Sequence, residues 1–402
     1  MATESVNGFV PILSFDYALR LAEENNADLR AAGSEVAASE AALAQLGKMS
    51  NPELAYSIED FKSETRTTTL QVSQVFELGG KRSARIGAGE RTRDVAIADR
   101  TIKLAEVRSS VSTAFFDVLI GQERMALAEA ALGLAQRATD IAGKRVASGK
   151  VSPVEDTKAR LAQANVRLEL AQAKSDLIAA HIRLCGTWNA DAQCFGTARG
   201  NPADVPDTIL FEDLATIVKR SPAVQRAAVE LDRRIALANV EQTRQSGNVT
   251  VSIGVKRAEE IGRNQALVGL SVPLPLFDRN QGTLLEALRR TDKARDELVA
   301  TESRLRMDLQ QAQQQLITAH EAIVVLREDI LPGAQSAYDA ALKGFEFGKF
   351  TFLEALDAQR TLLQAKTQYL AILATLHRTR ADLDRLIAAP AVNQTLKAKK
   401  IQ

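Results

Sequence analysis

A seven-residue spacing of apolar side chains dominates residues 82–148. The series runs Ile97, Leu104, Val111, Val118, Met125 and Leu132. A heptad spacing of this kind is typical of the seam of a coiled coil. The stretch contains no proline, so at about 1.5 Å per residue it would extend for roughly 100 Å as one helix. We therefore predict a rod-like helix rather than part of a compact domain.

The spacing changes from seven to two in two pairs of shorter segments. Residues 52–61 and 67–78 alternate apolar and polar side chains on either side of a polar turn, and residues 248–256 and 266–276 do the same. This alternation predicts two β-hairpins, each with one apolar face. The apolar positions are Leu54, Tyr56, Ile58, Leu70, Val72, Val249, Val251, Ile253, Val268, Leu270 and Val272.

The two hairpins belong to an internal duplication. Gly348-Lys349-Phe350-Thr351 repeats Gly149-Lys150-Val151-Ser152 at a shift of 199 residues (348 − 149 = 199). A period this long excludes a solenoid and predicts two copies of one arrangement. The first repeat, residues 1–207, is expected to hold helices over 13–46, 82–148 and 153–184. The second, residues 208–402, is expected to hold helices over 210–245, 279–347 and 352–388, followed by a C-terminal tail.

Composition narrows the class of protein. Aromatic residues are only 4%, which suits long helices packed through small side chains rather than thick cores. The net charge is +1, from 51 Lys+Arg against 50 Asp+Glu, so a nucleic-acid partner is disfavoured. Residues 1–11 lack the basic-then-apolar plan of a signal peptide. Cys185 and Cys194 would be free thiols in a cytosolic protein and a natural local disulfide in an exported one.

The apolar faces of the hairpins cannot be buried against the helices, because the helices are several times longer than the strands. These faces therefore need another partner. Tilted strands of about 9–11 residues can cross a bilayer, with the polar face toward a water-filled lumen. Four strands cannot close into a barrel, and open edges are not tolerated in lipid. The pattern therefore predicts that several copies of the chain contribute to one barrel.

Three motifs resemble the TolC family of outer-membrane efflux channels, and in particular its heavy-metal branch, typified by CzcC and CusC. They are Glu77-Leu78-Gly79-Gly80-Lys81-Arg82, Val272-Pro273-Leu274-Pro275-Leu276-Phe277 and the stretch that runs from Gly348 to Ala358. The resemblance places Gly79, Gly80, Pro273 and Pro275 at junctions between barrel and helices. It implies a homotrimer with a twelve-stranded transmembrane β-barrel, continued by an α-helical barrel through the periplasm of a Gram-negative bacterium.

The resemblance also implies partners and a cargo. The partners would be outer-membrane lipid, a periplasmic adaptor (membrane fusion protein) and an inner-membrane pump of the resistance-nodulation-division (RND) class. The channel would passively conduct divalent heavy-metal cations, either cobalt, zinc and cadmium or copper and silver. Gly149, Lys150, Val151, Ser152, Gly348, Lys349, Phe350 and Thr351 would form the helix-turn tips that meet the adaptor.

Acidic residues just after those tips are the expected lining of the periplasmic aperture. In the family such acids stand six and nine positions after the tip glycine, which corresponds here to Glu155, Glu354 and Asp357. Lys158 stands where the first repeat would carry its second acid, so the two repeats differ. The alternative interpretation is that acids in a first helical turn only complement the helix dipole.

No resident metal site, cofactor or catalytic group is expected. His181, His320 and His377 are isolated, and the two cysteines lack metal-ligand spacing. Two alternative functions stay open at this point. The same kind of channel could export drugs, organic solvents or a secreted protein, and metal sensitivity of a deletion strain would separate these cargoes. A soluble coiled-coil scaffold is the alternative from another class, and it predicts a monodisperse protein without detergent.

Overall fold

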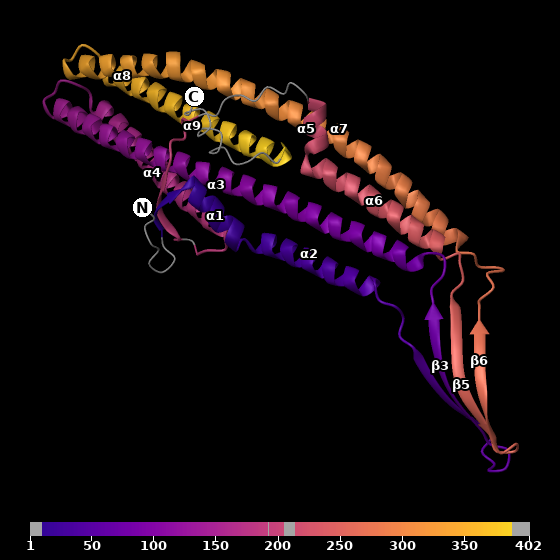
Figure 1. The fold of residues 1–402 in the computed structure, drawn as a ribbon. Coiled ribbons are helices and arrows are strands. Elements are labelled where there is room, and N and C mark those ends of the chain that lie inside the picture. The colour runs from indigo at the N-terminus through magenta and orange to yellow at the C-terminus, as the bar shows by residue number, and fades with distance from the viewer. Residues whose placement is uncertain (1–9, 192, 205–213, 388–402) are drawn as a thin grey trace, which may run out of the picture. The chain divides into compact units, whose positions relative to one another are not determined.

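The computed structural model describes residues 10–191, 193–204 and 214–387. Most of these residues are helical, and their strands form two sheets. The elements, labelled in Figure 1, are β1 (Val10–Ser14), α1 (Phe15–Asn25), α2 (Ala27–Leu46), β2 (Glu53–Glu59), β3 (Thr67–Phe76), α3 (Lys81–Ala147), α4 (Pro153–Gly186), β4 (Phe195–Arg199), α5 (Leu214–Arg220), α6 (Pro222–Thr243), β5 (Val249–Ala258), β6 (Arg263–Ser271), α7 (Gln281–Val325), a π-helix (Leu326–Ile330), α8 (Leu331–Glu346) and α9 (Phe352–Ile387).

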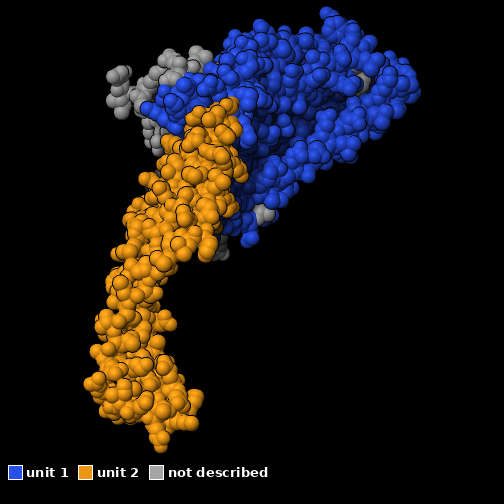
Figure 2. All heavy atoms as spheres, turned by 90° about the vertical axis from the view of Figure 1, so that its right-hand side faces the viewer, with its two compact units in different colours: residues 1–30, 102–221, 304–402 blue, residues 31–101, 222–303 orange. Residues whose placement is uncertain are grey.

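The chain divides into two compact units, which Figure 2 draws in different colours. Unit 1 comprises residues 1–30, 102–221 and 304–402, and unit 2 comprises residues 31–101 and 222–303. Each unit therefore draws on both sequence repeats. The two repeats are interleaved in space rather than folded as separate domains.

Unit 2 contains a four-stranded antiparallel sheet in the order β2-β3-β5-β6. The two hairpins meet through β3 and β5, which pair along their whole lengths. Directly paired residues lie on the same face of a sheet. Leu54 pairs with Val72, Val72 with Ile253, and Ile253 with Val268, so one row of apolar side chains crosses all four strands. The alternation read from the sequence is thus gathered onto a single face.

The helical part of unit 2 is held together by small side chains. Ala84 and Ala88 of α3 pack against Val240 of α6. Gly89 of α3 lies so close to α2 that an added Cβ would stand 2.7 Å from Leu46 and 2.9 Å from Leu43. Close-packed helices of this kind leave no room for a thick hydrophobic core.

Unit 1 has a hydrophobic core where β1 and α1 meet α3 and α4. Leu13, Phe15, Val111, Phe115 and Leu184 are buried there. The strand β1 pairs in parallel with β4, so the segment directly after Cys194 is anchored to the N-terminal strand. A disulfide joins Cys185 to Cys194, and both cysteines belong to this core.

Several predicted boundaries were wrong, and capping residues or prolines explain some of them. Residues 13–46 are not one helix, because Asn26 separates α1 from α2 and its Oδ1 accepts a hydrogen bond from the Leu29 N–H at 3.0 Å. The segment predicted as one helix over residues 210–245 is likewise split, because Ser221 separates α5, which ends at Arg220, from α6, which begins at Pro222. Proline favours the first position of a helix, so a new helix begins at Pro222.

The segment 279–347 also departs from a regular helix. A π-helix at Leu326–Ile330 interrupts it and ends two residues before Pro332. The missing N–H and bulky ring of proline disturb an α-helix. The strand predicted over 266–276 ends at Ser271, because Pro273 and Pro275 cannot donate ladder hydrogen bonds. The predicted residues 210–213 and 388 and the C-terminal tail lie outside the described residues.

Candidate functional site: an apolar sheet face and two helix-turn tips

The apolar face of the sheet is uncovered within unit 2. Of the predicted lipid-facing residues, Leu54 is 68% exposed and Leu270 71%, whereas Val249 and Val251 are half-buried. Along β3 and β5 it is often the apolar side chains, such as Leu70 and Ile253, that are more exposed than their polar neighbours. Soluble proteins bury such side chains, so a contiguous exposed patch marks an interaction surface.

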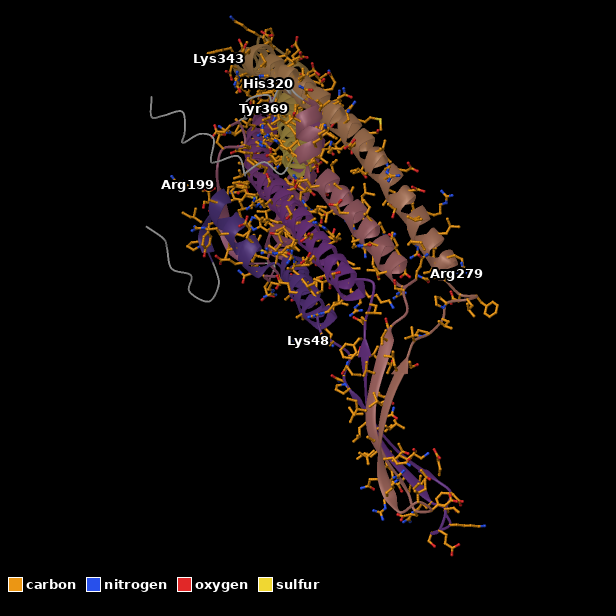
Figure 3. All side chains as sticks on the ribbon, turned by 45° about the vertical axis from the view of Figure 1, so that its right-hand side comes forward. Lys48, Arg199, Arg279, His320, Lys343 and Tyr369 are labelled. Atoms are coloured by element: carbon orange, nitrogen blue, oxygen red, sulfur yellow. A yellow bond between two sulfur atoms is a disulfide. The ribbon has the colours of Figure 1, made fainter. Side chains whose placement is uncertain are left out.

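The opposite face of the sheet is polar. It carries hydroxyl and amide side chains such as Thr69, Gln71 and Ser252. These residues alternate with the apolar positions along β3 and β5, so the pairing of the two strands places them on the same face. Lys256 forms an ion pair with Glu59 at 3.9 Å on this face. Hydroxyl, amide and paired charged groups suit contact with water. Figure 3 draws the side chains of the sheet as sticks on the ribbon.

Two glycines form the junction from β3 into α3. Gly79 and Gly80 have φ of 70° and 74°, values that side chains other than glycine rarely adopt. Just outside them, Arg85 donates to both carboxylate oxygens of Glu77, at 2.5 and 2.8 Å. This bidentate ion pair and the left-handed turn together fix how the chain passes from strand to helix.

The two predicted helix-turn tips adopt the same backbone geometry. Gly149 and Gly348 have φ of 69° and 74°. The Lys150 N–H donates to the Arg145 carbonyl at 2.9 Å, and the Lys349 N–H donates to the Gly344 carbonyl at 2.8 Å. Both are glycine-terminated helix ends, in which the turn satisfies carbonyls that the helix leaves unpaired. We call residues 149–152 the first tip and residues 348–351 the second tip.

The acids predicted to line an aperture have different local surroundings. The Glu354 carboxylate accepts hydrogen bonds from the Thr351 N–H at 2.7 Å and the Thr351 hydroxyl at 2.9 Å, while Thr351 Oγ1 accepts from the Glu354 N–H at 3.3 Å. This is a capping box. The hydrogen bonds from the Thr351 backbone and side chain lower the pKa of Glu354 below its ordinary value. Glu155 is half-buried, whereas Asp357 and Lys158 are exposed.

The tips also make a contact that the sequence reasoning missed. The Arg145 guanidinium, just before the first tip, lies over the ring of Phe345, just before the second, with Cζ 4.9 Å from the ring centroid. Phe345 is buried against Ala142 and Ala159, so one side chain links the two repeats. The only sequence signal was a departure from the repeat, since the shift of 199 places Val146 at the position of Phe345.

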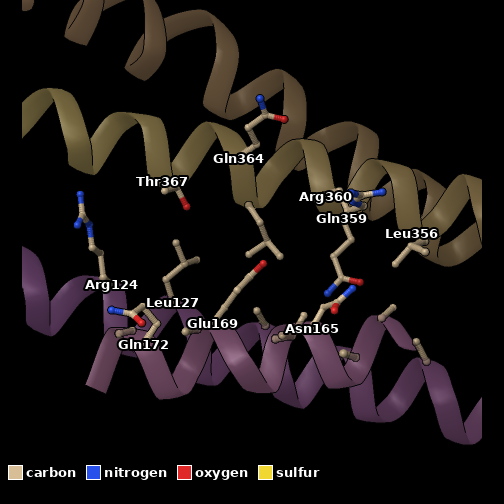
Figure 4. A pocket seen from close by; sticks show the side chains of 18 of the residues that line it. Arg124, Leu127, Asn165, Glu169, Gln172, Leu356, Gln359, Arg360, Gln364 and Thr367 are labelled. Atoms are coloured by element: carbon tan, nitrogen blue, oxygen red, sulfur yellow. The ribbon is translucent and has the colours of Figure 1, made fainter. Parts of the chain in front are cut away.

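A groove of about 1120 Å³ lies between α3, α4 and α9 of unit 1. Figure 4 shows Arg124 and Leu127 on one wall and Gln364 and Thr367 on the other. Its charged lining mixes both signs, with the basic residues Arg124, Lys158 and Arg360 and the acidic residues Glu169 and Asp176. A lining of three basic and two acidic groups therefore gives the groove no single sign of charge.

The described histidines include two that serve packing. His377 of α9 stacks on Phe116 with ring centroids 3.6 Å apart, and its Nε2 donates to the Pro202 carbonyl at 2.7 Å. His181 stacks on Phe195. Across the described residues no three His, Cys, Asp or Glu side chains are grouped so as to hold a metal ion. None of the described helices combines the length and apolar character needed to cross a membrane.

Comparison with known proteins decides the family. The profile of a family described as "Outer membrane efflux protein" matches residues 18–190 and 214–389. The chain belongs to this family. Its two matched segments fall one in each sequence repeat, and the members of the family are efflux channels of the outer membrane rather than enzymes.

Individual members of the efflux family resemble the chain over most of its length. It is 44% identical over 375 residues to the cobalt-zinc-cadmium resistance protein CzcC of Cupriavidus metallidurans, covering 93% of this chain and 90% of that relative. The outer-membrane channel OprN has a similar structure, with a TM-score of 0.81, 17% identity and coverage of 94% and 90% of the two chains.

A second similar structure is that of CusC, whose crystal structures concern conformational changes accompanying folding and transmembrane channel formation. It gives a TM-score of 0.80 with 18% identity, and the match covers 93% of this chain and 91% of CusC. At sequence identities this low, the two structures show a similar fold and nothing further. They confirm the predicted fold class, mainly α-helical with a β portion.

Proposed function

We propose that the chain is the outer-membrane channel of a tripartite efflux system and conducts divalent heavy-metal cations to the exterior. The observation that carries the assignment as a channel is the sheet of unit 2. One of its faces exposes a row of apolar side chains, the other is polar, and its terminal strands β2 and β6 have no further partner among the described residues. A bilayer accepts such a sheet only when other copies close its edges.

Three copies would supply twelve strands (3 × 4) to one barrel, and the helices would continue it as a periplasmic tunnel. A matching feature of unit 1 supports assembly. Along α4, Val154, Leu161, Leu168 and Ile182 recur at multiples of seven residues and are exposed in the single chain. A heptad seam without a partner within one copy suits packing against the next copy.

The heavy-metal cargo rests on the likeness to CzcC, a cobalt-zinc-cadmium resistance protein, at 44% identity over 93% of this chain. In this proposal an RND pump in the inner membrane selects and drives the cargo, and the channel is passive. A periplasmic adaptor would dock at the two tips. Phe350 of the second tip and Phe347, just before it, are exposed and available for such docking. The corresponding residues of the first repeat are Val151 and Ser148.

The cargo is tested in a strain from which the gene has been deleted. We expect the deletion to reduce tolerance of zinc, cobalt and cadmium salts, and the restored gene to recover it. If tolerance of these metals is unchanged while tolerance of organic drugs or solvents falls, the metal assignment is wrong and the channel assignment stands.

The aperture is tested by conductance of the reconstituted protein in planar bilayers. We propose that Glu155, Glu354 and Asp357 line it, and that Lys158 pairs with a neighbouring acid in its closed state. The variants Glu155→Gln, Glu354→Gln and Asp357→Asn should then raise the current through a closed channel. Glu169→Gln, on α4 but away from the tips, is the control. Unchanged current in all three variants would leave only the helix-capping role that the hydrogen bonds of Glu354 already provide.

A further inference from the structure

The six residues after β6 form an exposed apolar ribbon that is not part of any strand. Val272, Leu274, Leu276 and Phe277 are all exposed, Leu274 at 76% and Phe277 at 92%. The two remaining residues are Pro273 and Pro275, so none of the six carries a charged or hydrogen-bonding side chain. We call residues 272–277 the collar.

The backbone of the collar has fewer hydrogen-bond donors than a segment without proline. Pro273 and Pro275 have no N–H, and the Leu276 N–H donates to the Leu274 carbonyl at 2.9 Å. Three of the six residues therefore add no unpaired donor. An irregular segment at a membrane boundary is costly chiefly because of unpaired backbone groups, so this sequence lowers that cost.

The collar is also fixed in place rather than hanging free. Gly247, just before β5, lies against Pro273, and a Cβ added there would stand 3.1 Å from the Pro273 oxygen and 3.2 Å from its Cγ. Glycine at position 247 thus permits the close approach. The exposed side chains of the collar therefore extend from a backbone that packs against the segment before β5 at Pro273.

The collar continues the apolar face of the sheet at the helical end of the strands. Val272 extends the alternation of Val268 and Leu270 on β6. Directly after Phe277 the sequence becomes polar, with Asp278, Arg279 and Asn280, and Arg279 is labelled in Figure 3. An apolar band that ends in an aromatic residue and then a basic one is typical of a membrane–water interface.

We propose that the collar is seated in phospholipid, at the headgroup boundary of the inner leaflet, and so extends the lipid contact beyond the strands. This inference rests on the proposed function, because it requires the apolar sheet face to meet lipid. Lipid suits the collar better than a neighbouring copy or an adaptor, since the collar has no polar side chain to specify a protein partner and shares the alternation of the apolar face.

The test is quenching of tryptophan fluorescence by brominated phosphatidylcholine in vesicles that contain the full-length protein. Tryptophan is introduced at Phe277→Trp in the collar, at Leu270→Trp on the apolar face and at Ser271→Trp on the polar face. The wild-type protein gives the background, because its single tryptophan, Trp188, is buried in the core of unit 1. Leu276→Trp is a second collar variant in case Phe277→Trp does not fold.

We expect loss of emission from the collar variant and the Leu270→Trp variant, and none from Ser271→Trp. For the collar, bromine near the headgroup end of the acyl chain should quench more than bromine near the methyl end. Quenching of Leu270→Trp without quenching of either collar variant would overturn the collar and leave the channel intact. Failure to quench Leu270→Trp would instead contradict the proposed function.

Discussion

Gly89 sets how closely α3 approaches α2, whereas Gly87, two residues earlier, has open space around it. An added methyl group at Gly89 would meet Leu43 and Leu46, and at Gly87 it would meet nothing within 4 Å. Gly87→Ala should stabilise the protein by about 0.5–1 kcal/mol through helix propensity. Gly89→Ala should lose that gain to overpacking, which costs about 1–3 kcal/mol. Thermal unfolding of the two variants checks this, and equal melting temperatures would contradict it.

His377 makes the stability of unit 1 depend on pH. It is 3% exposed, and burial lowers its pKa below the ordinary value of 6.5, although the Pro202 carbonyl and Asp204 oppose the shift. The neutral ring is therefore the folded form. Its stabilising effect is complete above pH 6.5 and is lost as the pH falls toward the lowered pKa, because the unfolded chain takes up the proton first.

Replacing His377 by glutamine should remove this pH dependence while keeping a donor for the Pro202 carbonyl. We expect the melting temperature of His377→Gln to fall less steeply than that of the wild type as the medium is acidified. Asp204→Asn should make the fall steeper, because the carboxylate of Asp204 favours the charged ring. An identical acid slope in the wild type and His377→Gln would show that another group is responsible.

The contact of Arg145 with Phe345 suggests that Arg145 couples the two tips. A cation–π contact contributes about 0.5–2 kcal/mol, depending on how well water is excluded. Arg145→Gln should therefore loosen the tips and raise the current through the closed channel in planar bilayers. Lys144→Gln removes the same charge from the exposed neighbouring position and should have little effect. Equal currents in both variants would remove Arg145 from the gating account.

At the scale of elements, periodicity foresaw the long helices and both faces of the sheet. Heptads and alternation are repeated many times along a segment, so isolated exceptions do not obscure them. The same reasoning missed β1 and β4, because each has five residues and is held by pairing with a strand distant in sequence. It also missed the π-helix, which depends on how the chain accommodates Pro332.

The backbone conformation of the tips and junctions could be predicted from sequence, because a left-handed turn requires glycine. Side-chain contacts between residues far apart in the sequence could not be predicted. The tip glycines and the junction glycines all have positive φ, so glycine in these motifs was a sound signal. The capping box of Glu354 could also have been read from Thr351 and Glu354, which are three residues apart. The pairing of Arg145 with Phe345 could not, because 200 residues separate them (345 − 145 = 200).

The exposed seam of α4 leads to a prediction about assembly. Leu168 is 70% exposed in the single chain, whereas Leu184 on the same helix is fully buried. Leu168→Gln should leave the secondary structure of the protomer intact and weaken the association of copies, while Leu184→Gln should disrupt the fold of unit 1. Circular dichroism and mass determination in detergent separate the two effects. Unaltered assembly of Leu168→Gln would place the interface elsewhere.

At the scale of the whole molecule, the account depends on several copies combining their sheets. Among the described residues, the four-stranded sheet has an uncovered apolar face, and β2 and β6 have no partner on their outer edges. Such a sheet is unsuited to water as a single copy. The membership in the outer membrane efflux protein family agrees with a channel in the outer membrane, and structural neighbours that cover over nine-tenths of the chain support the fold.

The most direct test is to determine the mass of the detergent-extracted protein and then to measure the current of the same preparation in planar bilayers. The account predicts a complex of three chains that needs detergent to stay in solution and that forms ion-conducting pores. A single chain that remains monodisperse without detergent and passes no current would contradict it.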